Sequence, residues 1–237
     1  MDVTLDNIYH SELYFLPARN VQRKLIGLEV TANFVSDDGK VRFPTELVLP
    51  RLSPDEQCQL FAEKLALLET CQHFFIQHKL IAWINITPAI VPLLLINTSR
   101  LQAIKRFSFI ELTLNESFPA LAAGKADPAL AALAERFPLV LANFGAGESS
   151  TKAIFEGLFK RVALDRGFVQ RRAMSLSFDP FMRAIVTQIS PYCDSLLIAG
   201  IDSEELLTRI TPFGFGGMQG ALWPAVTADQ VTRLIQG

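Results

Sequence analysis

Short apolar segments alternate with amphipathic segments along most of the chain, and this alternation restricts the folds that the chain can adopt. The segments between the apolar runs carry polar caps, early acidic residues or prolines, and an apolar stripe, which are helix signals. Strands that alternate with helices predict βα units around a parallel sheet that is buried on both faces. The predicted strands are residues 80–87, 107–114, 138–144, 161–165 and 195–201.

Helix starts are the clearest local signals. Ser53, Pro54 and Glu56 form a capping-box pattern ahead of a helix predicted within residues 53–71. Asp127 and Asp179, each followed by proline, predict two further helix starts, and a serine is expected to cap the helix within residues 149–160. The remaining helices are predicted within residues 127–137, 179–189, 202–210 and 227–236.

The N-terminal region reads as a β-hairpin, with strands at residues 13–18 and 24–35 and a turn between them. Counting this irregular strand pair, about seven strands precede residue 202, and the glycine-rich residues 213–223 supply an eighth position. Eight strands in 237 residues favour a TIM-like (β/α) barrel, with an open doubly wound sheet as the alternative. The sequence contains no linker or repeat, so we expect a single domain over residues 1–237.

Composition excludes several classes of protein. Half of the residues are hydrophobic and 19% are charged, which predicts a sizeable core. The net charge of −2 gives no bulk attraction to nucleic acid, and the apolar runs are shorter than a membrane span of roughly 20 residues. The acidic, polar N-terminus has no secretory signal, and Cys58, Cys71 and Cys193 are odd in number and widely spaced. We therefore expect a cytoplasmic protein.

Two residue clusters invite a functional interpretation but favour a structural one. Cys71, His73 and His78 do not share one side of a helix, so we interpret this stretch as a helix end and polar loop, not a metal site. Glycines within residues 145–147 resemble a phosphate cradle, but a tight turn is favoured. The basic pairs at residues 160–161 and 171–172 are interpreted as solvated faces.

In a barrel, the functional site lies at the carboxyl ends of the strands. The residues at those predicted ends resemble, in order and spacing, the EAL family of cyclic di-GMP phosphodiesterases over about residues 12–232. The resemblance implies a barrel with two divalent metal ions that activate a water against a phosphodiester. The residues that carry it are Glu29, Asn85, Glu116, Ala142, Asn143, Ala163, Asp165, Ala199, Asp202 and Gln219.

Several family positions are retained. Glu29 matches the glutamate that gives the family its name, although Val30 and Thr31 follow it. Asn85 and Glu116 match metal-binding positions. Asp165 and Gln219 are also retained, and Asp202 stands where a glutamate is usual.

The departures fall on the catalytic roles. Ala142 and Asn143 replace an Asp-Asp pair, and Ala163 replaces the lysine that positions the attacking water. Ala199 replaces a glutamate, and Asn33 replaces the arginine that pairs with the nucleotide phosphate. Two-metal hydrolysis needs anionic ligands that hold both ions. We therefore predict no catalysis, metal, cofactor or nucleotide binding, and expect neighbouring donors to satisfy Glu29 and Glu116.

Within the family, the chain resembles the degenerate anti-FlhDC factors of enteric bacteria at residues 9–17, 66–83, 141–162 and 221–226. This resemblance implies a regulator that binds FlhD, keeps the flagellar master activator from promoter DNA, represses flagellar genes and promotes proteolysis by ClpXP. It implies no direct contact with nucleic acid or membrane. The alternatives are a weak cyclic di-GMP phosphodiesterase, using Glu29, Asn85 and Glu116, and a sensor that binds cyclic di-GMP without cleaving it.

Overall fold

The computed structural model describes residues 1–96, 98–147 and 151–235. The chain divides into two compact units, which are described one at a time. The first unit comprises residues 1–16, 28–110 and 225–237, and the second comprises residues 17–27 and 111–224. That the chain is a single domain stays a prediction. No described helix is long and apolar enough to cross a membrane.

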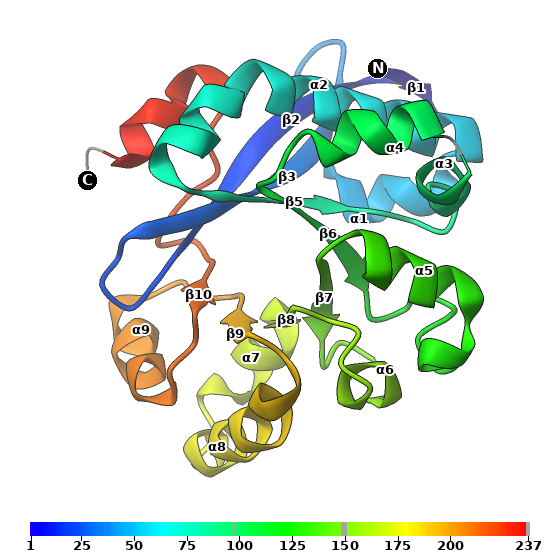
Figure 1. Ribbon diagram of the computed structural model, residues 1–237. Helices are drawn as coiled ribbons and strands as arrows, with labels where there is room; N and C mark the ends of the chain where they lie inside the picture. Colours follow the sequence, from blue (N-terminus) through cyan, green and yellow to red (C-terminus); the bar gives the residue numbers. More distant parts are fainter. Residues whose placement is uncertain (97, 148–150, 236–237) are drawn as a thin grey trace. The chain divides into compact units, whose positions relative to one another are not determined.

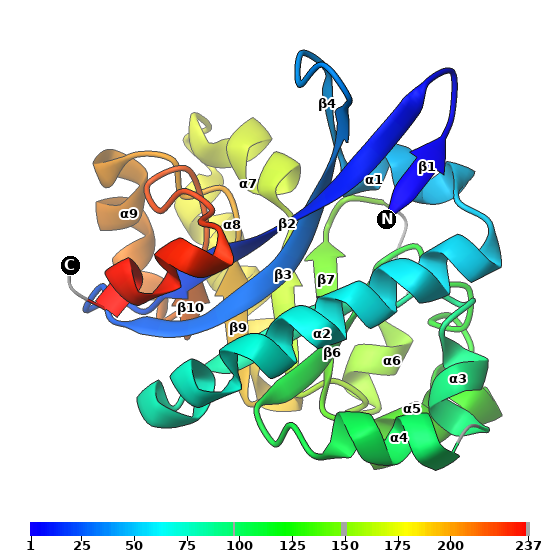
Figure 2. The same ribbon diagram turned by 90° about the horizontal axis from the view of Figure 1, so that it is seen from above.

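The predicted hairpin is confirmed as β2 (Ile8–Arg19) and β3 (Leu25–Ser36), and its strands outside residues 17–27 belong to the first unit. The short strands β1 (Asp2–Thr4) and β4 (Arg42–Pro44) pair with β2 and β3 respectively, and neither was predicted. The predicted strand β5 (Ile81–Asn85) lies next to β3. Helix α2 (Pro54–His78) lies along these strands, as Figure 2 shows. The other elements are α1 (Thr45–Val48), α3 (Val91–Leu95), α4 (Thr98–Lys105) and the 3-10 helices Leu49–Arg51 and Ala228–Ile235.

Helix α2 begins at the predicted capping box. The Ser53 hydroxyl accepts a hydrogen bond from the Glu56 N–H at 3.3 Å, and the Glu56 carboxylate accepts one from the Ser53 N–H at 2.7 Å. The helix continues to His78 and ends at Lys79, which adopts a left-handed conformation. The polar loop predicted after Cys71 is therefore wrong. Buried Phe75, which stacks on Phe109 with ring centroids 4.9 Å apart, explains why the last turns remain helical.

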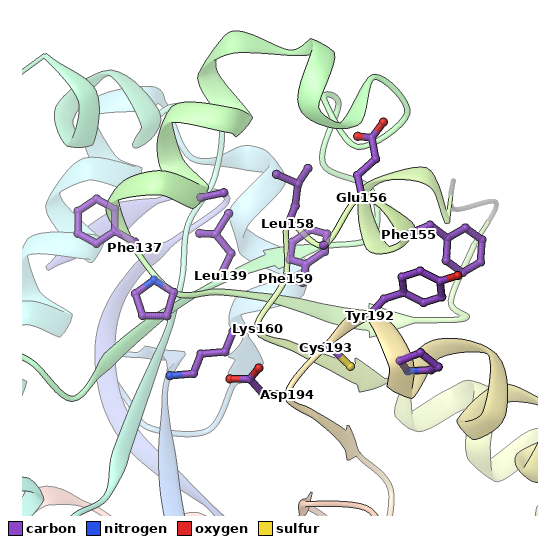
Figure 3. A pocket seen from close by; sticks show the side chains of 14 residues that line it. Phe137, Leu139, Phe155, Glu156, Leu158, Phe159, Lys160, Tyr192, Cys193 and Asp194 are labelled. Carbon is purple, nitrogen blue, oxygen red and sulfur yellow. The ribbon is translucent and has the colours of Figure 1, made fainter.

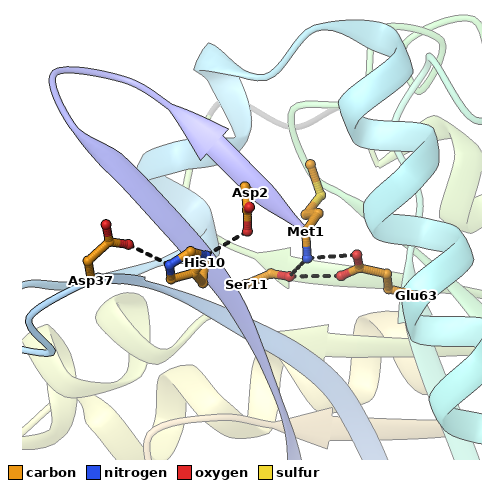
Figure 4. A network of polar contacts seen from close by, with 6 residues as sticks. All are labelled: Met1, Asp2, His10, Ser11, Asp37 and Glu63. Atoms are coloured by element: carbon orange, nitrogen blue, oxygen red, sulfur yellow. Dashed lines mark hydrogen bonds and ion pairs between the residues drawn. The ribbon is translucent and has the colours of Figure 1, made fainter.

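A network of hydrogen bonds and ion pairs connects residues 1 and 2 to β2, to α2 and to the turn after β3 (Figure 4). The Met1 ammonium donates to the Ser11 hydroxyl and lies 2.7 Å from the Glu63 carboxylate of α2. The two ring nitrogens of His10 contact the carboxylates of Asp2 and Asp37. One imidazole on β2 thus links β1 to the turn between β3 and β4.

The second unit contains the parallel strands β6 (Ile110–Asn115), β7 (Leu139–Phe144), β8 (Arg161–Leu164), β9 (Ser195–Ile198) and β10 (Gly217–Met218), which neighbour one another in this order. All of these strands were predicted. Helices follow the strands and lie along their outer side (Figure 1). These are α5 (Pro128–Arg136), α6 (Lys152–Phe155), α7 (Arg166–Ala173), α8 (Phe178–Ile189) and α9 (Glu204–Ile210), and 3-10 turns occur at Gly124–Ala126, Ser190–Tyr192 and Thr211–Phe213.

The helix starts of the second unit only partly match the predictions. Asp127 caps α5 as predicted, by accepting a hydrogen bond from the Leu130 N–H at 2.8 Å. Asp179 is not a cap, because α8 begins one residue earlier, and its carboxylate instead accepts a hydrogen bond from Arg209 at 2.7 Å. The serine cap expected for α6 falls on residues 149–150, outside the described residues. Two further differences are α7, which was not predicted, and residues 228–235, which form a 3-10 helix instead of an α-helix.

One basic pair is not the solvated face that the sequence indicated. Glu111 of β6 is buried, and its carboxylate lies 2.8 Å from Arg161 and 3.3 Å from Lys160. A buried carboxylate requires charged or hydrogen-bonding partners, and these two residues supply them. The pair therefore stabilises the amino-terminal ends of the strands in the second unit.

Candidate functional site at the strand ends

Backbone hydrogen bonds bring together the predicted strand-end residues of the second unit. The N–H of Glu116 donates to the carbonyl of Ala142 at 3.1 Å. Beyond β8, β9 and β10 the N–H groups of three further residues donate to the preceding strand at 2.9 to 3.1 Å. The carboxyl ends of parallel strands meet at one sheet edge, as expected. The three residues are Asp165, Ala199 and Gln219.

Ala142 and Asn143 lie in a bulge of β7. Leu141 is in register with Val162, whereas Phe144 is in register with Leu164, so β7 carries one extra residue between these pairs. Asn143 adopts a left-handed conformation, with φ of 58°. Its side-chain amide donates to the Asn115 side chain at 3.3 Å. The position at which the family resemblance implies two carboxylates therefore presents a methyl group and a neutral amide.

Glu116 is buried, and the backbone of the following loop satisfies its carboxylate. Oε1 accepts a hydrogen bond from the Gly145 N–H at 3.0 Å, and Oε2 accepts one from the Gly147 N–H at 2.7 Å. This confirms the expectation that neighbouring donors satisfy Glu116. A phosphate cradle would need these same N–H groups. Because they donate to Glu116 instead, the interpretation of residues 145–147 as a tight turn is also supported.

Gly145 has a structural requirement for glycine. Its φ is +96°, and a Cβ atom built on it would lie 2.8 Å from the ring of Phe168 in α7. The loop that binds Glu116 is therefore also packed directly against α7.

Asp165 and Asp202 have structural partners as well. Asp165 caps α7, by accepting a hydrogen bond from the Phe168 N–H at 2.6 Å. The Asp202 carboxylate accepts hydrogen bonds from Arg166 at 2.8 Å, from the Ala221 N–H at 2.7 Å and from the Gln170 side chain. Partial burial acts to raise the pKa of Asp202, but the Ala221 N–H and the Arg166 charge outweigh it and lower that pKa.

The alanines at two other family positions contribute only methyl groups. Ala163 lies within β8, in register with Leu197, and Ala199 follows β9. Gln219 follows β10, and its carbonyl accepts a hydrogen bond from the Ile201 N–H at 2.9 Å. Neither alanine can donate a proton, hold a water or ligate a metal.

In the first unit, Glu29 does not lie at a strand end, so that prediction is wrong. Strand β3 continues past it to Ser36 because β4 supplies a partner, with Asn33 in register with Pro44. Asn85 is the last residue of β5, as predicted.

A buried lysine near Glu29 was missed by the sequence reasoning. Lys64 of α2 is 5% exposed, and burial lowers the pKa of its ammonium while the charges of Glu29 and Glu46 act in the opposite direction. The available signal was its spacing, since Lys64 falls on the same helical face as the apolar residues Phe61 and Leu68.

The residues present do not fit a two-metal centre. Such a centre needs several anionic oxygens that hold two ions about 4 Å apart. Ala142 and Asn143 supply no charge, and Glu116 already accepts two backbone hydrogen bonds. Among the described residues, no group of three or more His, Cys, Asp and Glu side chains could hold a metal ion. In particular, Cys71 is buried in α2 whereas His73 is exposed.

A hollow of about 530 Å³ lies at the amino-terminal ends of β7, β8 and β9 (Figure 3). Phe155 and Tyr192 face each other at its rim, with ring centroids 4.9 Å apart. Lys160, Cys193 and Asp194 also line it. The strand ends here are opposite to those that carry catalytic residues in (β/α) barrels, so this hollow is not a candidate active site.

Comparisons with known proteins identify the family. The model of the EAL domain matches residues 7–225. The chain is 59% identical over 236 residues to the anti-FlhC(2)FlhD(4) factor YdiV of Salmonella arizonae, and 58% identical over 236 residues to that of Salmonella typhi, with 100% of each chain covered. It is similar to a crystal structure of the EAL-like domain protein YdiV, with 49% identity, a TM-score of 0.88, and coverage of 99% of this chain and 100% of the other. The TIM-like barrel class of the EAL type is thereby confirmed, and the chain belongs to the EAL domain family.

Proposed function

We propose that this protein is a non-catalytic regulator that binds the FlhD subunit of the flagellar master activator FlhDC and represses flagellar gene expression. The observation that carries the proposal is the identity of 59%, over the whole length of both chains, to a protein named an anti-FlhC(2)FlhD(4) factor. Binding to FlhD blocks the activator from promoter DNA, so the regulator needs no nucleic-acid surface of its own.

The arrangement of the strand ends supports the absence of catalysis. Each carboxylate at a family position in the second unit has an internal structural partner. Glu116 holds the loop at Gly145, Asp165 caps α7, and Asp202 pairs with Arg166. A hydrolase would need these oxygens for metal ions and water. In addition, Ala142 offers no metal ligand, and Ala163 offers no amine to position the attacking water.

The test is a binding measurement with purified FlhD and with the assembled FlhDC complex. Isothermal titration calorimetry should give a saturable complex at micromolar concentrations or below, and the chain should reduce promoter binding by FlhDC in a mobility-shift assay. The absence of a complex at those concentrations would overturn the proposal. Addition of ClpXP to the mixture tests the finer proposal, because FlhDC should then be degraded faster with the chain than without it.

The enzymatic alternative makes the opposite prediction in a separate assay. Glu29, Asn85 and Glu116 are retained, so a weak phosphodiesterase would convert cyclic di-GMP to a linear dinucleotide when manganese is supplied. We expect no linear product. Calorimetry with cyclic di-GMP should give no binding heat, since Asn33 cannot make the bidentate phosphate contact of an arginine.

Cell fractionation should place the protein in the cytoplasm.

A further inference from the structure

Two large apolar side chains stand almost fully in solvent between α7 and α8. Met174 is 93% exposed and Leu176 is 100% exposed, which are the highest values among the exposed large hydrophobic residues that the structure describes. They flank Ser175, and residues 174–176 are termed the apolar tip. Isolated exposed apolar residues are common on protein surfaces, but two that flank a single residue and have this exposure need a structural explanation.

The conformation of the apolar tip is held in place. Arg209 of α9 donates hydrogen bonds to the carbonyls of Ala173 and Ser175 and to the Asp179 carboxylate. The hydroxyls of Ser175 and Ser177 lie 2.8 Å apart. Arg209 therefore forms hydrogen bonds with residues before, within and after the apolar tip. A segment held by this many hydrogen bonds presents its apolar side chains without the entropy cost of ordering a loose loop on binding.

Helix α7, which leads into the apolar tip, is anchored on the former catalytic positions. Asp165 caps its first turn, and Asp202 holds Arg166. Phe168 packs against Gly145, in the loop that binds Glu116. The three carboxylates at family positions, those of Glu116, Asp165 and Asp202, thus hold α7 and the apolar tip in place.

The surface beside the apolar tip is basic. Helix α7 carries Arg166, Arg171 and Arg172 and no acidic residue, and because Arg166 pairs with Asp202, the positive charge of this surface comes from Arg171 and Arg172. Arg172 lies over the ring of Phe181 at 4.2 Å, which holds its guanidinium in place. The acidic residue in the first turn of α8, Asp179, pairs with Arg209. This concentration of positive charge, in a chain of net charge −2, favours an acidic partner surface.

We infer that α7 and the apolar tip form the docking surface for the protein partner, and that they bind an acidic face of it that contains an apolar groove. The inference rests on the proposed function, since it names the surface by which that regulation occurs. Met174 and Leu176 enter the groove, and Arg171 and Arg172 face the acidic rim. Apolar anchors beside arginines are typical of interface residues that dominate binding energy.

The decisive experiment measures the affinity of FlhD for the full chain and for the Met174→Asp/Leu176→Asp double variant. Both side chains are exposed, so the variant should fold with an unchanged circular dichroism spectrum and melting temperature. We expect its affinity to fall at least tenfold. Leu47→Asp is the matched control, because Leu47 is 62% exposed on α1 and its substitution should leave the affinity unchanged.

A charge variant tests the basic part of the surface independently. Arg171→Glu should slow association with FlhD, and the difference from the unaltered chain should shrink as salt is raised. Lys105→Glu, an equal change of charge on α4, should not slow it. Equal rates for the two variants would contradict the role assigned to α7.

The outcomes separate this inference from the proposed function. If the unaltered chain binds FlhD and the double variant binds equally well, the docking surface is wrong and the proposed function stands. If the unaltered chain does not bind FlhD, both are overturned. Two further results would also overturn the inference by identifying another occupant. One is a sedimentation mass of the double variant, measured without FlhD, that differs from the mass of the unaltered chain. The other is binding of the unaltered chain to anionic phosphatidylglycerol vesicles that the double variant does not show.

Discussion

The carboxylate of Glu116 accepts a hydrogen bond from the backbone N–H of Gly145 at 3.0 Å. In a hydrolase of this family the equivalent carboxylate is expected to bind a metal ion. Here it instead holds a loop that packs on α7 through the ring of Phe168. The relationship links the sheet edge that carries Glu116 to a surface helix, and it makes the stability of that edge depend on a charge.

Replacing this carboxylate should destabilise the protein. In Glu116→Gln the negative charge is lost and the loop N–H groups keep one neutral acceptor between them, so the free energy of unfolding should fall by about 1–3 kcal/mol. Urea denaturation followed by circular dichroism measures the change. Glu135→Gln is the matched control, because Glu135 is exposed on α5 and its substitution should have little effect. A Glu116→Gln variant as stable as the native protein would show that the loop does not depend on the charge.

Restoring the missing acid pair should not restore hydrolysis. Ala142→Asp/Asn143→Asp returns two carboxylates to β7, but Ala163, Ala199 and Asn33 still lack their family side chains. The new charges would also lie next to buried Glu116, so we expect lower stability along with no turnover. The measurement is chromatography of cyclic di-GMP incubated with manganese and the variant. Accumulation of linear dinucleotide would show that the acid pair alone is what the site lacks.

The elements that were predicted correctly have local causes in the sequence. The capping box of Ser53 and Glu56 and the cap at Asp127 involve residues within a few positions of one another, so the pattern contains the whole interaction. Strand β7 begins with the continuous apolar run Leu139–Leu141, which is the local signal of a strand buried on both faces.

The errors arose where partners are distant in the sequence. Glu29 was placed at a strand end by the family resemblance, although the apolar pattern of residues 24–35 already predicted a strand that continues past it, as β3 does with β4 as its partner. Asp179 was predicted to be a cap, whereas its partner is Arg209 of α9. Helix α7 was missed because Asp165 was interpreted only as a retained family position, although an aspartate three residues before an apolar position is also a cap signal.

The imidazole of His10 should make stability depend on pH. Hydrogen bonds to Asp2 and Asp37 raise the pKa of His10 above its usual 6.5. A raised pKa in the folded state means that the stabilisation is fully present below pH 6.5 and is lost as the pH rises through the folded-state pKa. The urea midpoint should therefore fall as the pH is raised from 6.5 upwards.

His10→Ala should remove this pH-dependent step, whereas His73→Ala should retain it, because His73 is exposed on α2 and has no part in the network of Figure 4. The step is measured by urea denaturation at a series of pH values in constant ionic strength. An identical step in the His10→Ala variant would assign it to another group.

The bulge in β7 gives the last test, because it isolates backbone conformation from chemistry. Asn143 has φ of 58°, a conformation that residues other than glycine adopt at a cost of roughly 1–2 kcal/mol and that asparagine tolerates better than alanine. Asn143→Ala and Asn143→Gly both lose the contact with Asn115, so their difference combines the left-handed strain of alanine with the larger folding entropy cost of glycine. The glycine variant should be the more stable of the two by about 1 kcal/mol in urea denaturation. If the alanine variant were equally stable, position 143 would not be left-handed in solution, and the bulge that presents Ala142 and Asn143 at the sheet edge would have to be redrawn.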